Sequence, residues 1–174
     1  SQDLLDLSQL EQPSQVERPD QPVDIQTVMH SVVDMMQLRA QRKGIQLLVN
    51  LSDDLPPLHI HPEHLEAILV NLIDNAIKYT PSNGSIDVGL RITNDQSVLI
   101  SVKDTGIGIM PENQELIFQR FRQVEITNIR EYGGNGLGLS ISKALIEKLG
   151  GTIKVNSKLG IGSTFIFTIP YLKG

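Results

Sequence analysis

The sequence predicts an α/β fold: a two-layer sandwich in which a mixed, mainly antiparallel sheet carries its helices packed on one face. The periodic segments follow the order helix, strand, helix, two strands, helix, two strands. Of the 174 residues, 40% are hydrophobic and 20% are charged, which suits one globular domain with its own core. Glycine and proline separate several of these segments, as they do between elements of a compact fold.

The first residues differ from the rest of the chain. Residues 1–12 place Leu4 and Leu7, with Leu10 or Leu5, on one helical face, which predicts the end of a longer amphipathic helix. Residues 13–23 contain three prolines and several charges, so they are expected to be a linker. Residues 24–174 are then expected to form the domain.

Two long helices are predicted in this domain. Asp24 is a suitable N-cap for a helix over 25–43, which ends at Gly44. Its predicted apolar side is Val28, Val32, Met35, Met36 and Leu38. The second helix, over 62–80, ends before Pro81, because the residue before a proline leaves the helical region. Its apolar stripe is Leu65, Ile68, Leu69, Leu72, Ile73 and Ala76.

The remaining elements are shorter. Residues 45–51 predict a buried strand. The other expected elements are a hairpin of 85–92 and 97–104, a short helix within 111–123, a polar loop over 124–136, a helix over 137–149 and two last strands over 152–157 and 163–169.

Composition excludes several classes of function. The formal net charge of −5 disfavours a nucleic-acid binder, which would present a basic face. The absence of cysteine excludes disulfides, thiolate nucleophiles and cysteine-ligated metals, and it fits a cytoplasmic location. No run of about 18 apolar residues and no signal peptide is visible, so no membrane contact by this segment is expected.

A polar stripe interrupts the apolar helix over 62–80. Asn71, Asn75 and Lys78 are spaced i, i+4 and i+7, so they share one face. An asparagine oxygen suits Mg²⁺, and a lysine one turn away could meet a phosphate. Such a stripe alone is more often a solvated surface.

Three glycine-rich segments follow. Asp104 ends a strand and precedes Gly106 and Gly108, where a carboxylate could accept from an exocyclic amine and the glycines could admit a flat base. The segment 134–139 (GNGLGL) precedes a helix, whose free N–H groups bind phosphate, and it matches neither a Rossmann nor a Walker pattern. The segment 160–165 (GIGSTF) turns into the last strand. The Asp104 loop alone could be a simple turn, and the segment 160–165 alone indicates little.

Together, in this order and with the aromatic pair Phe118 and Phe121, these segments resemble the catalytic domain of sensor histidine kinases. That family shares an ATPase superfamily with gyrase, Hsp90 and mismatch-repair clamps. The matching segments resemble its N box (71–80), G1 box (104–109), F box (117–121), G2 box (134–139) and G3 turn (160–165). The resemblance covers about residues 24–170 and implies the Bergerat ATP-binding fold.

The resemblance implies a binder of ATP and Mg²⁺. Asn75 would hold Mg²⁺ with Asn71 in support, Lys78 would contact phosphate, and Tyr79 the adenine or ribose. Asp104 would take the adenine amino group. The other implied nucleotide contacts are Gly106, Gly108, Gly134, Gly136, Leu137, Gly138, Leu139 and Thr164, with residues 122–135 as a lid.

Residue 71 separates two reactions. Hydrolysing relatives carry a glutamate there as general base, whereas Asn71 cannot take a proton at neutral pH. Residue 71 therefore favours transfer of the γ-phosphoryl group to a protein acceptor. The resemblance implies that this acceptor is the histidine of a dimerisation hairpin and that a response-regulator receiver domain is the next partner. The alternatives are a docking or sensing module that binds nucleotide without transfer, and a hydrolase.

The four histidines do not fit the acceptor. None is followed by an acidic residue, as the family's phosphorylated histidine usually is. We therefore expect the acceptor to be absent from this chain, which should not autophosphorylate. A metal site at His59, His61 and His64 lacks an evident fourth ligand. His61 replaces the usual aspartate before a proline, and as a poor N-cap it should cost about 0.5–1 kcal/mol.

The F box also departs from the family. Arg122 and Gln123 stand where Tyr-Arg is common, so the arginine is displaced by one position. Whether Arg120, Arg122 or Arg130 would meet the γ-phosphate is left open by the sequence.

Overall fold

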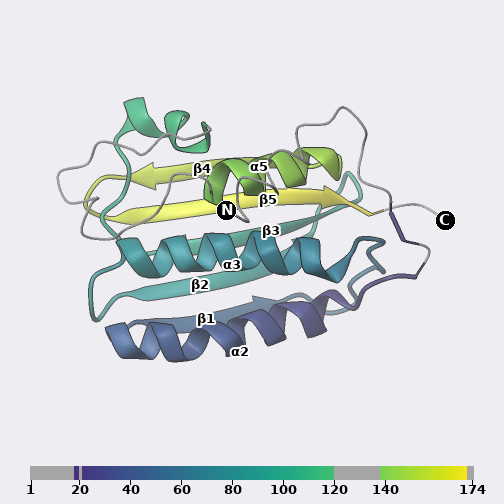
Figure 1. The fold of residues 1–174 in the computed structure, drawn as a ribbon, viewed down its shortest axis with the longest axis horizontal. Helices are drawn as coiled ribbons and strands as arrows, with labels where there is room; N and C mark the ends of the chain where they lie inside the picture. The colour runs from purple at the N-terminus through teal and green to yellow at the C-terminus, as the bar shows by residue number, and fades with distance from the viewer. Residues whose placement is uncertain (1–17, 20, 120–137, 172–174) are drawn as a thin grey trace, which may run out of the picture.

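The computed structural model describes residues 18, 19, 21–119 and 138–171. Helices α2, α3 and α5 form one layer, with α3 in the middle, over one face of a five-stranded sheet (Figure 1). In chain order the described elements are α2 (Ile25–Lys43), β1 (Gln46–Leu51), α3 (Pro62–Tyr79), β2 (Ser85–Ile92), β3 (Ser97–Asp104), the 3₁₀ turns η1 (Pro111–Asn113) and η2 (Leu116–Phe118), α5 (Gly138–Lys148), β4 (Thr152–Lys158) and β5 (Gly162–Pro170).

The strand order is β1-β2-β3-β5-β4. β1 pairs with β2 in parallel, and the other three pairings are antiparallel. A two-residue turn cannot join parallel strands, and α3 supplies the crossover from β1 to β2. The predicted two-layer sandwich with a mixed, mainly antiparallel sheet is confirmed.

The core lies between the sheet and the helix layer. Alternate residues of β5 are buried, among them Phe165 and Phe167, because one face of the sheet meets helices and the other faces outward. From the helix layer, α3 buries Leu65, Ile68 and Leu72 completely, as a central helix must. The predicted apolar stripe of α3 is confirmed.

Helix α2 begins and ends as predicted. The Asp24 carboxylate accepts hydrogen bonds from the backbone N–H groups of Gln26 (3.1 Å) and Thr27 (3.4 Å). Gly44 ends the helix with a φ of 76°, a left-handed conformation that glycine adopts without strain.

The predicted apolar side of α2 is wrong at two positions. Met35 and Leu38 are 59% and 54% exposed. The buried stripe advances by three or four residues at a time, and these two positions fall outside its arc. Its members are Ile25, Val28, Met29, Val32, Val33, Met36 and Ala40.

Two further predictions need correction. The strand over 45–51 is not buried throughout: β1 lies at the edge of the sheet, and Leu48 on the outward side is 42% exposed. The short helix expected within 111–123 is replaced, over the described residues, by η1 and η2. Gln119 is extended (ψ 143°), which ends η2 after one turn.

The described part of the predicted linker contacts the domain. The Arg18 guanidinium donates to the carbonyl oxygens of Leu149, after α5, and Pro170, at the end of β5. Val23 forms an isolated β-bridge with Leu58. The helix expected over 1–12 lies outside the described residues. None of the described helices is both long and apolar enough to cross a bilayer.

Candidate nucleotide-binding site

Asp104 is a buried carboxylate at the end of β3, 6% exposed. Its Oδ1 accepts hydrogen bonds from the backbone N–H groups of Gly106 (2.8 Å) and Ser163 (3.1 Å). No residue among those described donates to Oδ2. Burial raises the pKa of this carboxyl, while the two N–H donors lower it. Asp104 therefore holds one satisfied oxygen and one oxygen open to a ligand donor.

The loop after Asp104 is clamped between two other parts of the fold. On one side, the N–H of Ile107 donates to the carbonyl of Tyr79 at the end of α3 (3.1 Å). On the other side, the N–H of Gly160 in the β4–β5 turn donates to the carbonyl of Ile107 (2.7 Å). The loop therefore has a fixed position that depends on α3 and on the β4–β5 turn.

The two glycines of this loop permit that clamping. A Cβ on Gly106 would lie 2.5 Å from the Tyr79 carbonyl oxygen. Gly108 has a φ of 76°, and a Cβ there would lie 2.2 Å from the Lys158 carbonyl oxygen. Since real Cβ atoms do not approach backbone oxygens so closely, both positions require glycine for packing within the protein.

Asn71 connects α3 to the start of α5. Its Nδ2 donates to the carbonyl oxygen of Gly138 (3.3 Å) and to the hydroxyl of Ser142 (3.2 Å). The structure thereby brings two predicted site segments together, the N box and the end of the G2 box. Helix N-termini bind anions through free N–H groups, and the first turn of α5 lies beside the polar stripe.

Asn75 lies one turn further along α3 and is half-buried. Its side chain makes no hydrogen bond with any residue in the described part of the chain. An amide oxygen that bonds to no described residue is available to a ligand, and oxygen atoms are the ligands that Mg²⁺ prefers.

Lys78 has a partner that the sequence analysis missed. Its Nζ lies 3.2 Å from Oδ2 of Asp74, one turn earlier in α3, while the Arg39 guanidinium of α2 lies 2.5 Å from the other oxygen, Oδ1. The Asp74 carboxylate therefore sits between two cations from two helices. Its place within the N box, four residues before a lysine, is the i, i+4 signal from which the pair could have been predicted.

Tyr79 and Thr164 differ in how the structure places them. Tyr79 ends α3 and is half-buried. Its carbonyl oxygen accepts the hydrogen bond from the Asp104 loop. Thr164 belongs to the outward set of β5, since burial alternates along that strand and Ser163 and Phe165 are buried. Ser163 contacts Asp104, so strand alternation favours Ser163 over Thr164 beside the carboxylate.

Phe118, the first aromatic residue of the F box, packs on the core edge. Its ring meets Phe165 of β5 edge-to-face, with centroids 6.0 Å apart. The Lys143 ammonium of α5 lies 5.8 Å from the Phe118 centroid. The F box thereby contacts both the G3 strand and the helix that follows the G2 box.

Leu139 is half-buried in the first described turn of α5. Several predicted residues lie outside the described part of the chain. They are Gly134, Gly136, Leu137, Phe121, the lid over 122–135, and the three arginines considered for the γ-phosphate, Arg120, Arg122 and Arg130.

The histidines near the start of α3 form no metal group among the described residues. His61 is the N-cap residue of α3 but its side chain makes no capping hydrogen bond, as the sequence predicted. Its ring contacts that of His64 edge-to-face, with centroids 5.1 Å apart. Burial is the main cause that lowers the pKa of His64, which favours the neutral form of that ring.

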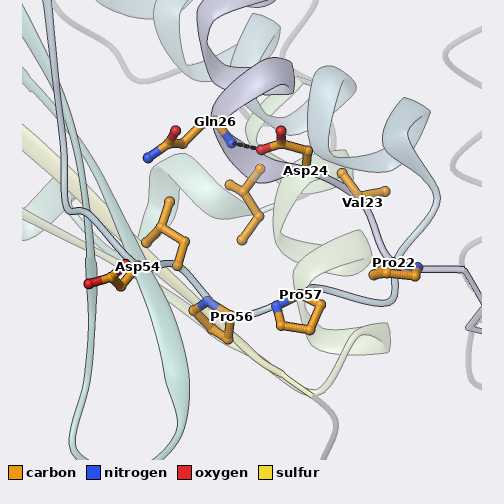
Figure 2. A pocket seen from close by; sticks show the side chains of 9 residues that line it. Pro22, Val23, Asp24, Gln26, Asp54, Pro56 and Pro57 are labelled. Carbon is orange, nitrogen blue, oxygen red and sulfur yellow. Dashed lines mark hydrogen bonds between the residues drawn. The ribbon is translucent and has the colours of Figure 1, made fainter.

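Figure 2 shows a shallow cavity where α2 begins, at the opposite end of α3 from the Asp104 loop. Prolines and two aspartates line it, and one of them, Asp24, points to the Gln26 N–H that it caps. The Asp24 carboxylate is therefore already engaged by the first turn of α2. Its lining residues are Pro22, Val23, Asp24, Ile25, Gln26, Asp54, Leu55, Pro56 and Pro57.

Comparison with known proteins agrees with this arrangement. The family described as "Histidine kinase-, DNA gyrase B-, and HSP90-like ATPase" matches residues 60–173. The circadian input-output histidine kinase CikA of Synechococcus elongatus is 35% identical over 170 residues, covering 97% of this chain and 22% of its own length. The signal transduction histidine-protein kinase BarA of Escherichia coli K12 is 36% identical, covering 96% of this chain and 18% of its own length.

Solved structures show the same relationship. The kinase ShkA, in complex with AMPPNP, superposes with a TM-score of 0.86 at 32% identity, covering 99% of this chain and 35% of that protein. The catalytic domain of the histidine kinase ThkA, in a nucleotide-free form, superposes with a TM-score of 0.76 at 26% identity, covering 90% of this chain and 97% of that domain. The chain thus spans about a fifth of CikA and BarA but nearly the whole ThkA domain, and it belongs to the histidine kinase-, gyrase B- and HSP90-like ATPase family as an ATP-binding catalytic domain of the sensor histidine kinase type.

Proposed function

We propose that this domain binds Mg-ATP and presents the γ-phosphoryl group to a histidine on a separate helical hairpin of the same kinase, in two-component signalling. The observation that carries the proposal is the buried Asp104 at the end of β3, whose Oδ2 accepts from no described residue. The loop after Asp104 contacts the end of α3, the helix whose polar stripe holds Asn75. This arrangement supports an amine acceptor beside the end of α3 and candidate ligands for phosphate and metal along that helix.

The base end suits adenine. The 6-amino group of adenine is a donor, and Asp104 Oδ2 is an acceptor without a donor in the described structure. Because Oδ1 is fixed by two N–H groups, the carboxylate does not need to rotate when the base arrives. A guanine would present a carbonyl oxygen to the same carboxylate and would be repelled.

The phosphate end suits a triphosphate with its metal. Asn75 would be the protein ligand of Mg²⁺, with Asn71 beside it, and the first turn of α5 and Lys78 would face the phosphates. Mg²⁺ would neutralise charge on the phosphates during in-line transfer. The chain's own residues supply positioning and electrostatic stabilisation, while the nucleophile comes from the hairpin.

Residue 71 supports transfer over hydrolysis. The Asn71 amide group is oriented by its two donor contacts with α5, and a carboxamide cannot accept a proton from water at neutral pH. A water molecule would therefore lack a general base at this position. A receiver domain of a response regulator is the proposed next acceptor of the phosphoryl group.

Calorimetric titration with a non-hydrolysable ATP analogue, with and without Mg²⁺, tests the nucleotide site. We expect saturable binding tighter than about 1 mM, and about tenfold weaker binding for Asn75→Ala only when Mg²⁺ is present. Asn50→Ala, an exposed asparagine on β1, is the matched control and should bind as the wild type does. Absence of binding, or equal losses with and without the metal, would refute the proposed metal ligand.

A second assay separates transfer from its alternatives. The chain is mixed with radiolabelled ATP and a separate hairpin carrying a phosphorylatable histidine. Label on the hairpin, and none retained on this chain alone, is the expected result. Binding without label on the hairpin would favour a docking or sensing module, and release of inorganic phosphate would favour a hydrolase.

A further inference from the structure

A row of three polar side chains crosses the sheet at the proposed base site. Asp104 on β3 is bonded to the backbone of Ser163 on β5, and Ser163 is the register partner of Ser157 on β4. We call Asp104, Ser163 and Ser157 the polar row. Since the same side of β3 and β5 otherwise buries apolar residues, three adjacent polar residues there require a reason.

Ser157 lies at the centre of a hydrogen-bond network that the sequence did not predict. Its Oγ lies 2.8 Å from the N–H nitrogen of Ile109, 3.1 Å from the carbonyl oxygen of Gly162 and 2.7 Å from Oγ of Ser163. The Gln114 side chain adds bonds to the carbonyl oxygens of Ile109 (3.0 Å) and Ser157 (3.1 Å). The network joins β4 to the exit of the Asp104 loop.

Proton counting assigns direction to this network. A hydroxyl has one proton and two lone pairs. The Ile109 N–H can only donate to Ser157 Oγ, and the Gly162 carbonyl can only accept from it. The arrangement that satisfies all three contacts sends the Ser157 proton to Gly162 and brings the Ser163 proton to Ser157. The Ser163 hydroxyl proton then points away from Asp104.

We propose that Ser157 is a positioning residue for nucleobase selection: it holds the Ser163 hydroxyl proton away from Asp104, so that Oδ2 stays open to the amino group of adenine. This inference rests on the proposed ATP-binding function. Without Ser157, the Ser163 hydroxyl loses its acceptor, and the backbone of the same residue already contacts the Asp104 carboxylate. We therefore expect the released hydroxyl to turn toward Asp104 and to compete there with the amino group. Ser157 touches no base itself and acts only through Ser163.

The test compares non-hydrolysable analogues of ATP and GTP by calorimetry. For Ser157→Ala, we expect ATP-analogue affinity to fall about threefold to tenfold, the value of one hydrogen bond, while weak GTP-analogue binding stays within about twofold. The ratio of ATP-analogue affinity to GTP-analogue affinity should therefore decrease. A general loosening of the site would weaken both analogues equally, and that result would overturn the inference.

Three further variants sharpen the test. Ser157→Thr keeps the hydroxyl and should restore the wild-type preference. Ser157→Ala combined with Ser163→Ala removes the competing donor and should bind the ATP analogue more tightly than Ser157→Ala alone. Ser101→Ala, on the outward side of β3, removes a hydroxyl that bonds to no other described residue and should change neither analogue.

The outcomes separate the two proposals. If the wild-type chain prefers the ATP analogue but Ser157→Ala keeps the full preference, the role of Ser157 is refuted and the ATP site stands. If the wild type shows no binding or no preference, the proposed function fails first. Should Ser157→Ala not fold, Ser163→Ala alone must retain the adenine preference, and its loss would overturn the inference.

Discussion

The base end and the phosphate end of the proposed site are built differently. Around Asp104, the loop is held by backbone hydrogen bonds of 2.7–3.1 Å and by glycines that allow backbones to touch. Along the stripe of α3, Asn71 makes bonds of 3.2–3.3 Å, Asn75 has no partner among the described residues, and Lys78 is one third exposed. Contacts within the protein fix the base end, whereas the sparser contacts at the phosphate end fit the proposal that ligand and metal complete it.

The largest effect should come from filling the contact at Gly108. Gly108→Ala places a Cβ 2.2 Å from the Lys158 carbonyl oxygen and also strains a φ of 76°. We expect a loss of about 3 kcal/mol or more in the free energy of unfolding, measured by urea denaturation, together with loss of ATP binding.

Gly160→Ala is the matched control for this change. Its φ is similar, 81°, but a Cβ there meets nothing within 4 Å. The substitution should cost only the left-handed strain, about 1–2 kcal/mol, and leave nucleotide affinity within about twofold. Equal losses for the two alanines would mean that backbone conformation, and not the close contact, holds the base end together.

The second prediction concerns the charge of Asp104. Asp104→Asn keeps an oxygen for the two N–H donors but turns an amide donor toward the base, so ATP affinity should fall about tenfold to a hundredfold in calorimetry. Stability should not fall, because an uncharged group is buried in place of a carboxylate. A destabilised variant with normal affinity would contradict the assignment.

The pH dependence of Asp104 follows from the same burial. The pKa of this carboxyl is raised in the folded chain above its ordinary 3.8. Between pH 3.8 and the higher pKa of the folded chain, the folded state binds more protons than the unfolded state. This group therefore makes the free energy of unfolding fall as pH rises through that range. ATP binding needs the ionised form and should weaken on acidification at a pH where an ordinary aspartate is still charged. Asp104→Asn should lose both dependences.

The sequence predicted the elements of the base end but not the contacts that assemble them. Asp104, Gly106 and Gly108 are recognisable as a strand-end motif. That Gly106 meets the backbone of Tyr79, and Gly108 that of Lys158, depends on three elements meeting at one sheet end. No local spacing encodes such contacts between distant segments.

Strand alternation distinguishes two neighbouring residues that the motif alone does not. Within the segment 160–165, strand alternation separates buried Ser163 from outward Thr164, given that Phe165 is in the core.

Met35 and Leu38 show where hydrophobicity alone gives the wrong prediction of burial. An apolar residue outside the helical arc stays exposed, because geometry and not hydrophobicity decides which side of α2 meets the sheet.

The third prediction tests the far end of α3, away from the site. His61→Asp supplies a side-chain acceptor to an N-terminus that has none, so the free energy of unfolding should rise by about 0.5–1 kcal/mol with unchanged ATP affinity. Asp24→Ala, which removes the working cap of α2, should lower it by about 1 kcal/mol. A change in affinity for His61→Asp would show that the two ends of α3 are coupled.

The smallest effects belong to the phosphate end, where Asp74 holds Lys78. Asp74→Asn releases Lys78 and removes a negative charge near the phosphates, so ATP-analogue affinity should rise up to about fivefold at low salt, as expected for a partly exposed ion pair. Arg39→Gln leaves Asp74 with Lys78 as its one ion-pair partner among the described residues, and affinity should fall slightly. Both changes in affinity should become smaller at high salt. If Asp74→Asn instead weakens binding of the ATP analogue in the presence of Mg²⁺, Asp74 contributes to the metal site. The phosphate end would then contain more of its ligands in place before nucleotide binds than its exposed side chains indicate.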